Sequence, residues 1–154
     1  MSDLLRAAYH EAGHASVACA EGFKVHHIRL MEPDDGYVDY EGRSDAPLCS
    51  RLSVVLAGHV AEGRASDAGL EWRTEVEARV REEAFILEDL RVDHAQAIGF
   101  DSDPAQAALL LRGSGHQAEC DLFGSAWDHA NDVLAADWED VRTIAACLAG
   151  EEAR

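Results

Sequence analysis

Residues 10–14 read His-Glu-Ala-Gly-His, an HExxH pattern whose residue types can bind a metal and move a proton. On a helix, residues four apart lie on one face, so His10 and His14 can offer two imidazole nitrogens to a single ion. Glu11 lies about 100° further round the helix, where its carboxylate can reach a water beside the metal. Zinc is the usual occupant of such a histidine pair. The alternative is an accidental pair of surface histidines, because the chain has eight histidines in all.

The flanking residues predict that this motif lies inside a helix of about twenty residues. Ser2 and Asp3 are suitable N-cap residues, and Gly22 is well placed to end the helix. Small residues between them recur at helical spacing and would let other backbone pack closely. A helix is what the two histidines need in order to share one metal ion.

The length of 154 residues predicts one domain, 1–154, with a single core. The four cysteines lack the CxxC spacing of zinc ribbons and redox motifs, so we expect buried thiols in a reducing compartment. No apolar run approaches the roughly twenty residues that span a bilayer. We therefore expect a cytoplasmic protein without a membrane segment.

The charge of the chain limits its partners. Thirty acidic residues against 13 basic ones give a net charge of −17. Such a chain repels the phosphates of nucleic acids and the surface of anionic membranes. We expect a soluble acidic surface, and an acidic interaction protein with a vestigial HExxH motif is a minority alternative.

Hydrophobic spacing, turn signals and helix caps divide the rest of the chain into short elements. The predicted fold class is mainly α (α+β), with a small two- or three-stranded sheet. In the longest helix, the residues expected to face the core are Leu70, Val76, Val80, Phe85, Leu87 and Leu90. The expected strands are 24–31 and 37–40, joined by a turn at 33–36, and the later helices are 47–63, 70–96, 102–113, 117–135 and 138–149.

Three segments together carry a resemblance to a known family. Residues 8–15 read Ala-Tyr-His-Glu-Ala-Gly-His-Ala, residues 25–30 form an extended stretch, and residues 56–62 read Leu-Ala-Gly-His-Val-Ala-Glu. In this order they resemble the peptidase domain of the FtsH-type zinc proteases, and the apolar spacing over 126–148 resembles its closing helices. The resemblance implies a helical zinc metallopeptidase domain with Zn²⁺ held by His10 and His14 and with Glu11 as the catalytic base.

The resemblance also implies a third zinc ligand, an aspartate at the start of a later helix. Asp103 fits this pattern best because it opens a helix, while Asp93 and Asp89 are the alternatives. Glu62 is a third ligand of another type, a carboxylate that orients a liganding histidine, or an ordinary acid at the end of a helix. His59 departs from the family, which has a small residue or arginine there. The remaining histidines lack ligand spacing and are expected at the surface: His26, His27, His94, His116 and His129.

FtsH-type proteins also contain a membrane segment and an ATPase module, and this sequence has no GxxxxGK[ST] phosphate loop. We therefore expect hydrolysis of peptide bonds in unfolded protein segments or peptides that is not driven by ATP, unless a separate ATPase or partner protein assists. The sequence does not specify an oligomer. A metal-binding protein without proteolytic activity is the main alternative.

Overall fold

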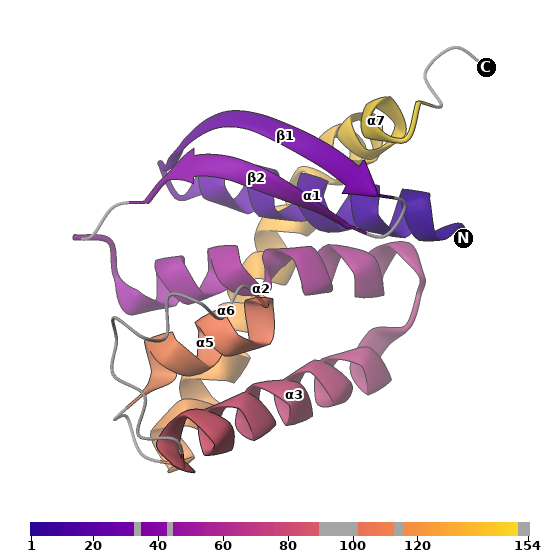
Figure 1. Cartoon of the computed structure of the whole chain (residues 1–154). Helices are drawn as coiled ribbons and strands as arrows, with labels where there is room; N and C mark the ends of the chain where they lie inside the picture. The colour runs from indigo at the N-terminus through magenta and orange to yellow at the C-terminus, as the bar shows by residue number, and fades with distance from the viewer. Residues whose placement is uncertain (33–34, 43–44, 90–101, 113–115, 151–154) are drawn as a thin grey trace.

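The structure is a computed structural model that describes residues 1–32, 35–42, 45–89, 102–112 and 116–150. It is mainly helical with one two-stranded antiparallel sheet, which confirms the predicted fold class (Figure 1). Among the described residues, no helix is both long and apolar enough to cross a membrane. The elements are α1 (Asp3–Ala20), β1 (Lys24–Glu32), β2 (Asp35–Glu41), α2 (Leu48–Ala65), α3 (Gly69–Asp89), α5 (Asp103–Leu111), α6 (His116–Ala136) and α7 (Trp138–Leu148).

Helix α1 begins and ends where the sequence predicts. The Ser2 side chain accepts a hydrogen bond from the backbone N–H of Leu5, 3.1 Å away, and so caps the first turn. At the other end Gly22 has a φ of +81°, in the left-handed region that favours glycine. Its N–H donates to the carbonyl of Cys19, and the chain then turns into β1. The HExxH motif is therefore held in the middle of a well-defined helix.

Helices α1 and α2 lie side by side in close contact (Figure 1). They can approach so closely because the residues between them are small. A methyl group at Gly13 of α1 would lie 2.5 Å from the Cβ of Ala61 and 2.6 Å from the carbonyl oxygen of Ala57, both on α2. No side chain larger than hydrogen fits there without separating the helices. This close approach places the HExxH motif directly against α2.

The two strands form a hairpin that covers α1 (Figure 1). Val25 pairs with Tyr40 and Ile28 with Val38 in an antiparallel register. The described sheet has only these two strands, so β2 pairs along one edge only. Alternate residues of β2 are exposed and half-buried, as expected for a sheet with one face toward the protein.

Helix α2 lies at the centre of the core, where Leu52, Val54 and Leu56 are fully buried. On its far side it packs against α6, and the buried Ser53 hydroxyl lies 3.1 Å from the carbonyl of Ala126 on that helix. Helix α5 packs against both α2 and α3. Its first turn is capped by the Ser102 hydroxyl, as the sequence predicts.

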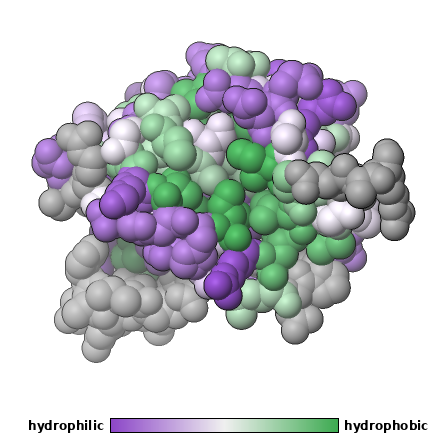
Figure 2. Space-filling model, turned by 90° about the horizontal axis from the view of Figure 1, so that it is seen from above, coloured by the Kyte–Doolittle hydropathy of each residue, from purple (hydrophilic) through white to green (hydrophobic). Residues whose placement is uncertain are grey.

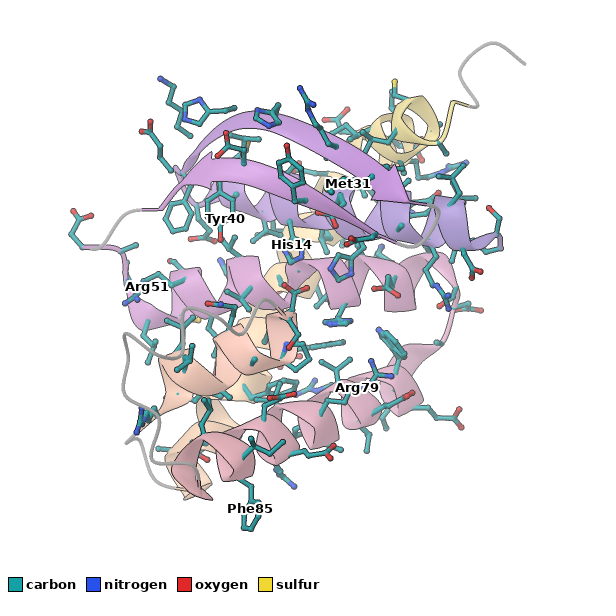
Figure 3. All side chains as sticks on the ribbon, viewed as in Figure 1. His14, Met31, Tyr40, Arg51, Arg79 and Phe85 are labelled. Carbon is teal, nitrogen blue, oxygen red and sulfur yellow. The ribbon has the colours of Figure 1, made fainter. Side chains whose placement is uncertain are left out.

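The prediction of which α3 side chains face the core is partly wrong. Val76, Val80 and Leu87 are buried as expected, but Leu70 is 74% exposed and Phe85 is 70% exposed. Figure 3 shows the Phe85 ring pointing away from the rest of the molecule. The apolar stripe of α3 is therefore narrower than its sequence implies. Leu90 lies outside the described residues.

The prediction that the four cysteines are buried is also wrong. Cys19 and Cys147 are exposed, and Cys49 and Cys120 are partly exposed.

The face seen from above, which includes the sheet, is mixed in character (Figure 2). Hydrophobic side chains gather in the middle of this view, and hydrophilic side chains border them. Isolated apolar residues on a folded surface are ordinary. The exposed large hydrophobic residues include Met31 and Tyr37 of the hairpin.

Candidate metal centre

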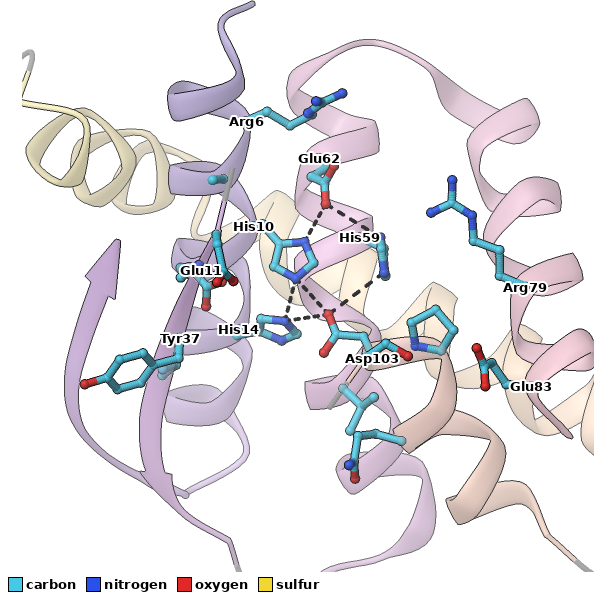
Figure 4. A pocket seen from close by; sticks show the side chains of 18 of the residues that line it. Arg6, His10, Glu11, His14, Tyr37, His59, Glu62, Arg79, Glu83 and Asp103 are labelled. Carbon is cyan, nitrogen blue, oxygen red and sulfur yellow. Dashed lines mark hydrogen bonds and ion pairs between the residues drawn. The ribbon is translucent and has the colours of Figure 1, made fainter. Parts of the chain in front are cut away.

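Three side chains from two distant parts of the chain meet at one point (Figure 4). The Nε2 atoms of His10 and His14 lie 3.0 Å apart. Oδ2 of Asp103, at the start of α5, lies 2.7 Å from the first and 3.0 Å from the second. We call this group the His–His–Asp cluster. Its three atoms are close enough together to contact one metal ion at the same time.

The outer nitrogen of each histidine already has a partner. Nδ1 of His14 lies 2.7 Å from the carbonyl oxygen of Val54, which can only accept a hydrogen bond, so Nδ1 carries the hydrogen. Nδ1 of His10 is hydrogen-bonded to the Glu62 carboxylate of α2. In the neutral imidazoles both Nε2 atoms therefore point a lone pair at Asp103. Such a convergence of lone pairs requires a cation or extra protons, and these outer partners are typical of metal-binding histidines.

The closeness of imidazoles and carboxylates also shifts the pKa values of the cluster. Burial opposes protonation of His10, but the carboxylates of Asp103 and Glu62 outweigh it and raise the pKa of His10 to about 10. Burial also opposes the charged forms of His14 and Asp103. Their attraction for each other outweighs it, so the pKa of His14 is raised and the pKa of Asp103 is lowered. The site therefore attracts positive charge, which protons can supply when no metal is bound.

Space for the cluster depends on Gly58 of α2. A methyl group at this position would lie 2.5 Å from Nε2 of His10 and 2.5 Å from Nε2 of His14. Because Gly58 has no side chain, the Nε2 edges of both rings can lie against the backbone of α2. Gly58 belongs to the segment that carries the family resemblance, and its position gives a physical reason for a glycine there.

Glu11 lies close to the cluster without belonging to it. It is only 6% exposed, and burial raises the pKa of its carboxyl group. Its side chain runs beside β2, where a methyl group at Gly36 would lie 2.9 Å from Cγ of Glu11. In Figure 4 the Glu11 carboxylate lies on one side of His10 and the His59 ring on the other. Glu11 therefore has the position expected of a proton acceptor next to a metal site.

His59 is the residue that the sequence interpretation missed. It is 8% exposed, and its Nε2 lies 3.9 Å from Oδ2 of Asp103. Its Nδ1 is buried without a hydrogen-bond partner among the described residues, 3.6 Å from Oε1 of Glu62. Burial and the nearby His10 lower the pKa of His59 to about 4, so its ring is neutral. The sequence contains two weak signals for it: the i, i+3 spacing to Glu62, and a histidine where the resembling family has a small residue or arginine.

Trp72 holds the His59 segment in place from α3. Its indole N–H donates a hydrogen bond to the main-chain carbonyl of His59, 2.7 Å away. The two rings also contact each other, with centroids 5.8 Å apart. The position of His59 is therefore set by packing between α2 and α3.

The cluster opens into a cleft of about 700 Å³ between β2, α1, α2, α3 and α5. Figure 4 shows Tyr37 on the hairpin side and Arg79 and Glu83 on the α3 side. Among the described residues that line the cleft, five belong to β2 (Asp35, Gly36, Tyr37, Val38 and Tyr40) and none to β1. The edge of β2 that does not pair with β1 therefore forms part of the cleft wall. Its charged lining residues are Arg6, Glu11, Asp35, Glu62, Arg79, Glu82, Glu83 and Asp103.

The structure brings together His10, Glu11, His14 and Asp103, the site residues that the sequence predicts. Glu62 contacts the outer nitrogen of His10, as expected of a carboxylate that orients this histidine. With His10 and His59 it also forms a second group whose ligand atoms could hold a metal ion. Asp93 lies outside the described residues, as does the side chain of Asp89 at the end of α3.

Of the other histidines, three are exposed, as predicted. Each has an acidic residue nearby: Glu41 for His26, Asp39 for His27 and Glu21 for His129. His94 and the side chain of His116 lie outside the described residues.

Comparison with known proteins does not assign this chain to a family. No protein-family model, no curated protein and no solved structure matches this chain. The resemblance to FtsH-type peptidases remains a prediction. What can be concluded about this protein rests on the geometry of the His–His–Asp cluster and the cleft around it.

Proposed function

We propose that this protein is a zinc-dependent metallopeptidase that hydrolyses peptide bonds in unfolded protein segments or peptides. One observation carries the proposal: two imidazole nitrogens and one carboxylate oxygen converge within 3.0 Å of one another. The partners of the outer nitrogens leave both inner nitrogens free to bind a cation. The HExxH motif and the order of the three resembling segments support the same class of enzyme.

The residues that would hold the zinc ion are those of the His–His–Asp cluster. Their donor set of two nitrogens and one oxygen suits zinc and leaves a further position for water or substrate. When bound, zinc acidifies a coordinated water and polarises a carbonyl group. Glu62 keeps His10 in the required tautomer, and the Val54 carbonyl does the same for His14.

Glu11 supplies the proton transfer. Its carboxylate accepts a proton from the attacking water and passes it to the nitrogen of the leaving amine. Burial raises its pKa, which makes the carboxylate a stronger base than an exposed glutamate. Gly36 allows it to lie against β2 without a steric clash. The general base is thus positioned beside the wall of the cleft where a substrate would lie.

The cleft supports an extended substrate. The unpaired edge of β2 offers backbone N–H and C=O groups, and an extended peptide can add to such an edge as another strand. Pairing of this kind is independent of sequence along most of the peptide. Folded proteins cannot offer a free extended strand, so we expect unfolded segments to be cleaved in preference.

A metal-binding protein without proteolysis is the second candidate function. His59 favours it, because with His10 and Glu62 it forms a second group whose ligand atoms lie close enough together to hold a metal ion. The two groups share His10, so an ion held by the second group would take one ligand from the His–His–Asp cluster. The two candidates predict the same metal content and differ in cleavage.

The test combines metal analysis with cleavage of an unfolded, fluorescently labelled casein. We expect about one zinc ion per chain, retained in Glu11→Gln and lost in His14→Ala, with cleavage abolished in both. The matched controls are Glu75→Gln and His129→Ala, which change exposed residues of the same types and should behave like the wild type. Absence of bound zinc at neutral pH would refute both candidates. Stoichiometric zinc without cleavage would favour the second.

A further inference from the structure

The Nδ1 side of His10, opposite the His–His–Asp cluster, carries a second group of possible metal ligands. His10, His59 and Glu62 each offer one ligand atom, and the three atoms lie within 4.8 Å of one another. All three residues line the cleft, so an ion can reach them from solvent. We call this set the His–His–Glu group. Two imidazole nitrogens and one carboxylate oxygen are donors that suit zinc.

The surroundings of His59 point to a bound cation. This residue is 8% exposed, and its Nδ1 is buried without a hydrogen-bond partner among the described residues. Such a nitrogen costs free energy. Oε1 of Glu62 lies 3.6 Å from it, which is too long for a hydrogen bond. Zinc bonds of about 2.0–2.1 Å place neighbouring ligand atoms roughly 3.3 Å apart, so this spacing is close to that of two ligands of one ion.

The His59 ring is held in this orientation by α3. The indole N–H of Trp72 donates a hydrogen bond to the main-chain carbonyl of His59, and the two rings contact each other. With an ion on Nδ1, the hydrogen of the neutral ring stands on Nε2, which faces the Asp103 carboxylate at 3.9 Å. A carboxylate attracts an N–H group, so both nitrogens of His59 then face groups of opposite charge.

His10 lies between the two groups and presents a different nitrogen to each. Its Nε2 faces Asp103, and its Nδ1 is hydrogen-bonded to Glu62. The rings of His10 and His59 are nearly perpendicular, with centroids 5.0 Å apart. A neutral imidazole that loses its one N–H hydrogen has a lone pair on each nitrogen. An ion in the His–His–Glu group therefore takes His10 by Nδ1, and the ring is shared between two ions.

We propose that His10, His59 and Glu62 form a second metal site, for zinc or a similar dication, that shares the His10 ring with the His–His–Asp cluster. The inference rests on the proposed function, because His10 also binds the first ion. The second ion replaces the hydrogen that Nδ1 of His10 donates to Glu62, and this proton is released to solvent. Loss of the proton and repulsion between two dications make the second ion bind more weakly than the first. The second site therefore fills only when zinc exceeds one ion per chain.

The experiment titrates the metal-free protein with Zn²⁺ in a calorimeter. The wild type should show a tight step and a weaker step, each of about one ion per chain. His59→Phe keeps a ring against Trp72 and should lose only the weaker step. Glu62→Gln is the second variant and should also lose it, because a neutral amide oxygen still accepts a hydrogen bond from His10 but is a poor zinc ligand. The control His129→Phe changes an exposed histidine that also pairs with a glutamate, and it should keep both steps.

Copper provides a second readout, because two Cu²⁺ ions that share one imidazole ring are magnetically coupled. The EPR signal of the wild type should fall as the second Cu²⁺ ion binds, whereas that of His59→Phe should not. Thermal unfolding in the presence of chelator checks that each variant folds.

A single binding step in the wild type, or a weaker step kept by both His59→Phe and Glu62→Gln, would overturn the inference while leaving the His–His–Asp site intact. Failure of the wild type to bind any ion would instead overturn the proposed function as well.

Discussion

The main-chain carbonyl of Val54 accepts a hydrogen bond from Nδ1 of His14, 2.7 Å away, and thereby decides which nitrogen of that histidine faces the cleft. Val54 is fully buried in the core, so this oxygen has a fixed position. The chemistry of the site is therefore connected to the packing of α2. Changes in that packing should alter metal binding as well as stability.

Gly58→Ala should abolish tight zinc binding. The added methyl group would lie 2.5 Å from Nε2 of both His10 and His14 and would push the rings apart. Overpacking of this kind costs about 1–3 kcal/mol of stability. Zinc content after dialysis and thermal unfolding measure the two effects separately.

Gly63→Ala is the matched control for that change. This glycine is also buried in α2, and a methyl group there would lie 2.5 Å from Cδ1 of Trp72, away from the two imidazoles. It should lower stability by a similar amount but keep the zinc. If both variants kept the zinc, Gly58 would not be what leaves room for the metal.

Asp103→Asn should weaken zinc binding by about tenfold or more, because a neutral amide oxygen is a poorer ligand than a carboxylate. The control is Asp128→Asn, which changes an exposed aspartate paired with Arg73. Isothermal titration with Zn²⁺ gives both affinities. Equal affinities would transfer the role of third ligand to Asp93 or Asp89.

The stability of the metal-free protein should fall as the pH rises above neutrality. The pKa of His10 is raised from 6.5 to about 10 by the carboxylates of Asp103 and Glu62, which outweigh the effect of burial. A raised pKa in the folded state stabilises the protein fully below the unfolded value of 6.5, and this contribution is lost as the pH approaches about 10.

Bound zinc should counteract the loss of stability that the metal-free protein shows as the pH rises. It competes with the protons of the imidazoles, so its binding strengthens as the pH rises. The difference in Tm between zinc-loaded and chelator-treated protein should therefore widen between about pH 6 and pH 9. Thermal unfolding at several pH values measures this. A difference that stayed constant would mean that zinc does not displace protons from His10.

Two phenylalanines should differ sharply in their contribution to stability. Phe123 of α6 is 2% exposed, and Phe123→Ala should cost about 3–5 kcal/mol of unfolding free energy. Phe85 of α3 is 70% exposed, and Phe85→Ala should change it by less than about 0.5 kcal/mol. Urea unfolding of both variants tests this. A large loss in Phe85→Ala would mean that its ring is buried against another surface in solution.

Local chemistry explains why much of the fold was predictable. Ser2, Gly22 and Ser102 act through hydrogen bonds or backbone angles within a few residues of themselves, so helix ends could be predicted from neighbouring residues. The same is true of the pair His10 and His14, whose spacing on one helix needs no tertiary information.

Other features depend on how elements pack together, which periodicity does not reveal. Phe85 was expected to face the core, but α3 is only partly covered by its neighbours and this ring remains in solvent. His59 could not be assigned because its distance to Asp103 depends on how α2 is rotated toward α5. Glu62 was left with three alternatives, because its contact with Nδ1 of His10 depends on the direction of that ring and not on spacing in the sequence.

The His–His–Asp cluster joins residues that are 89 positions apart in the chain, from His14 on the first helix to Asp103 on α5. An ion bound there acts as a reversible cross-link that closes a long loop, and cross-links of this length restrict the unfolded chain strongly. Metal availability would then influence how long the whole domain survives in the presence of other proteases. The three side chains proposed to bind the catalytic metal, those of His10, His14 and Asp103, would therefore also cross-link the fold.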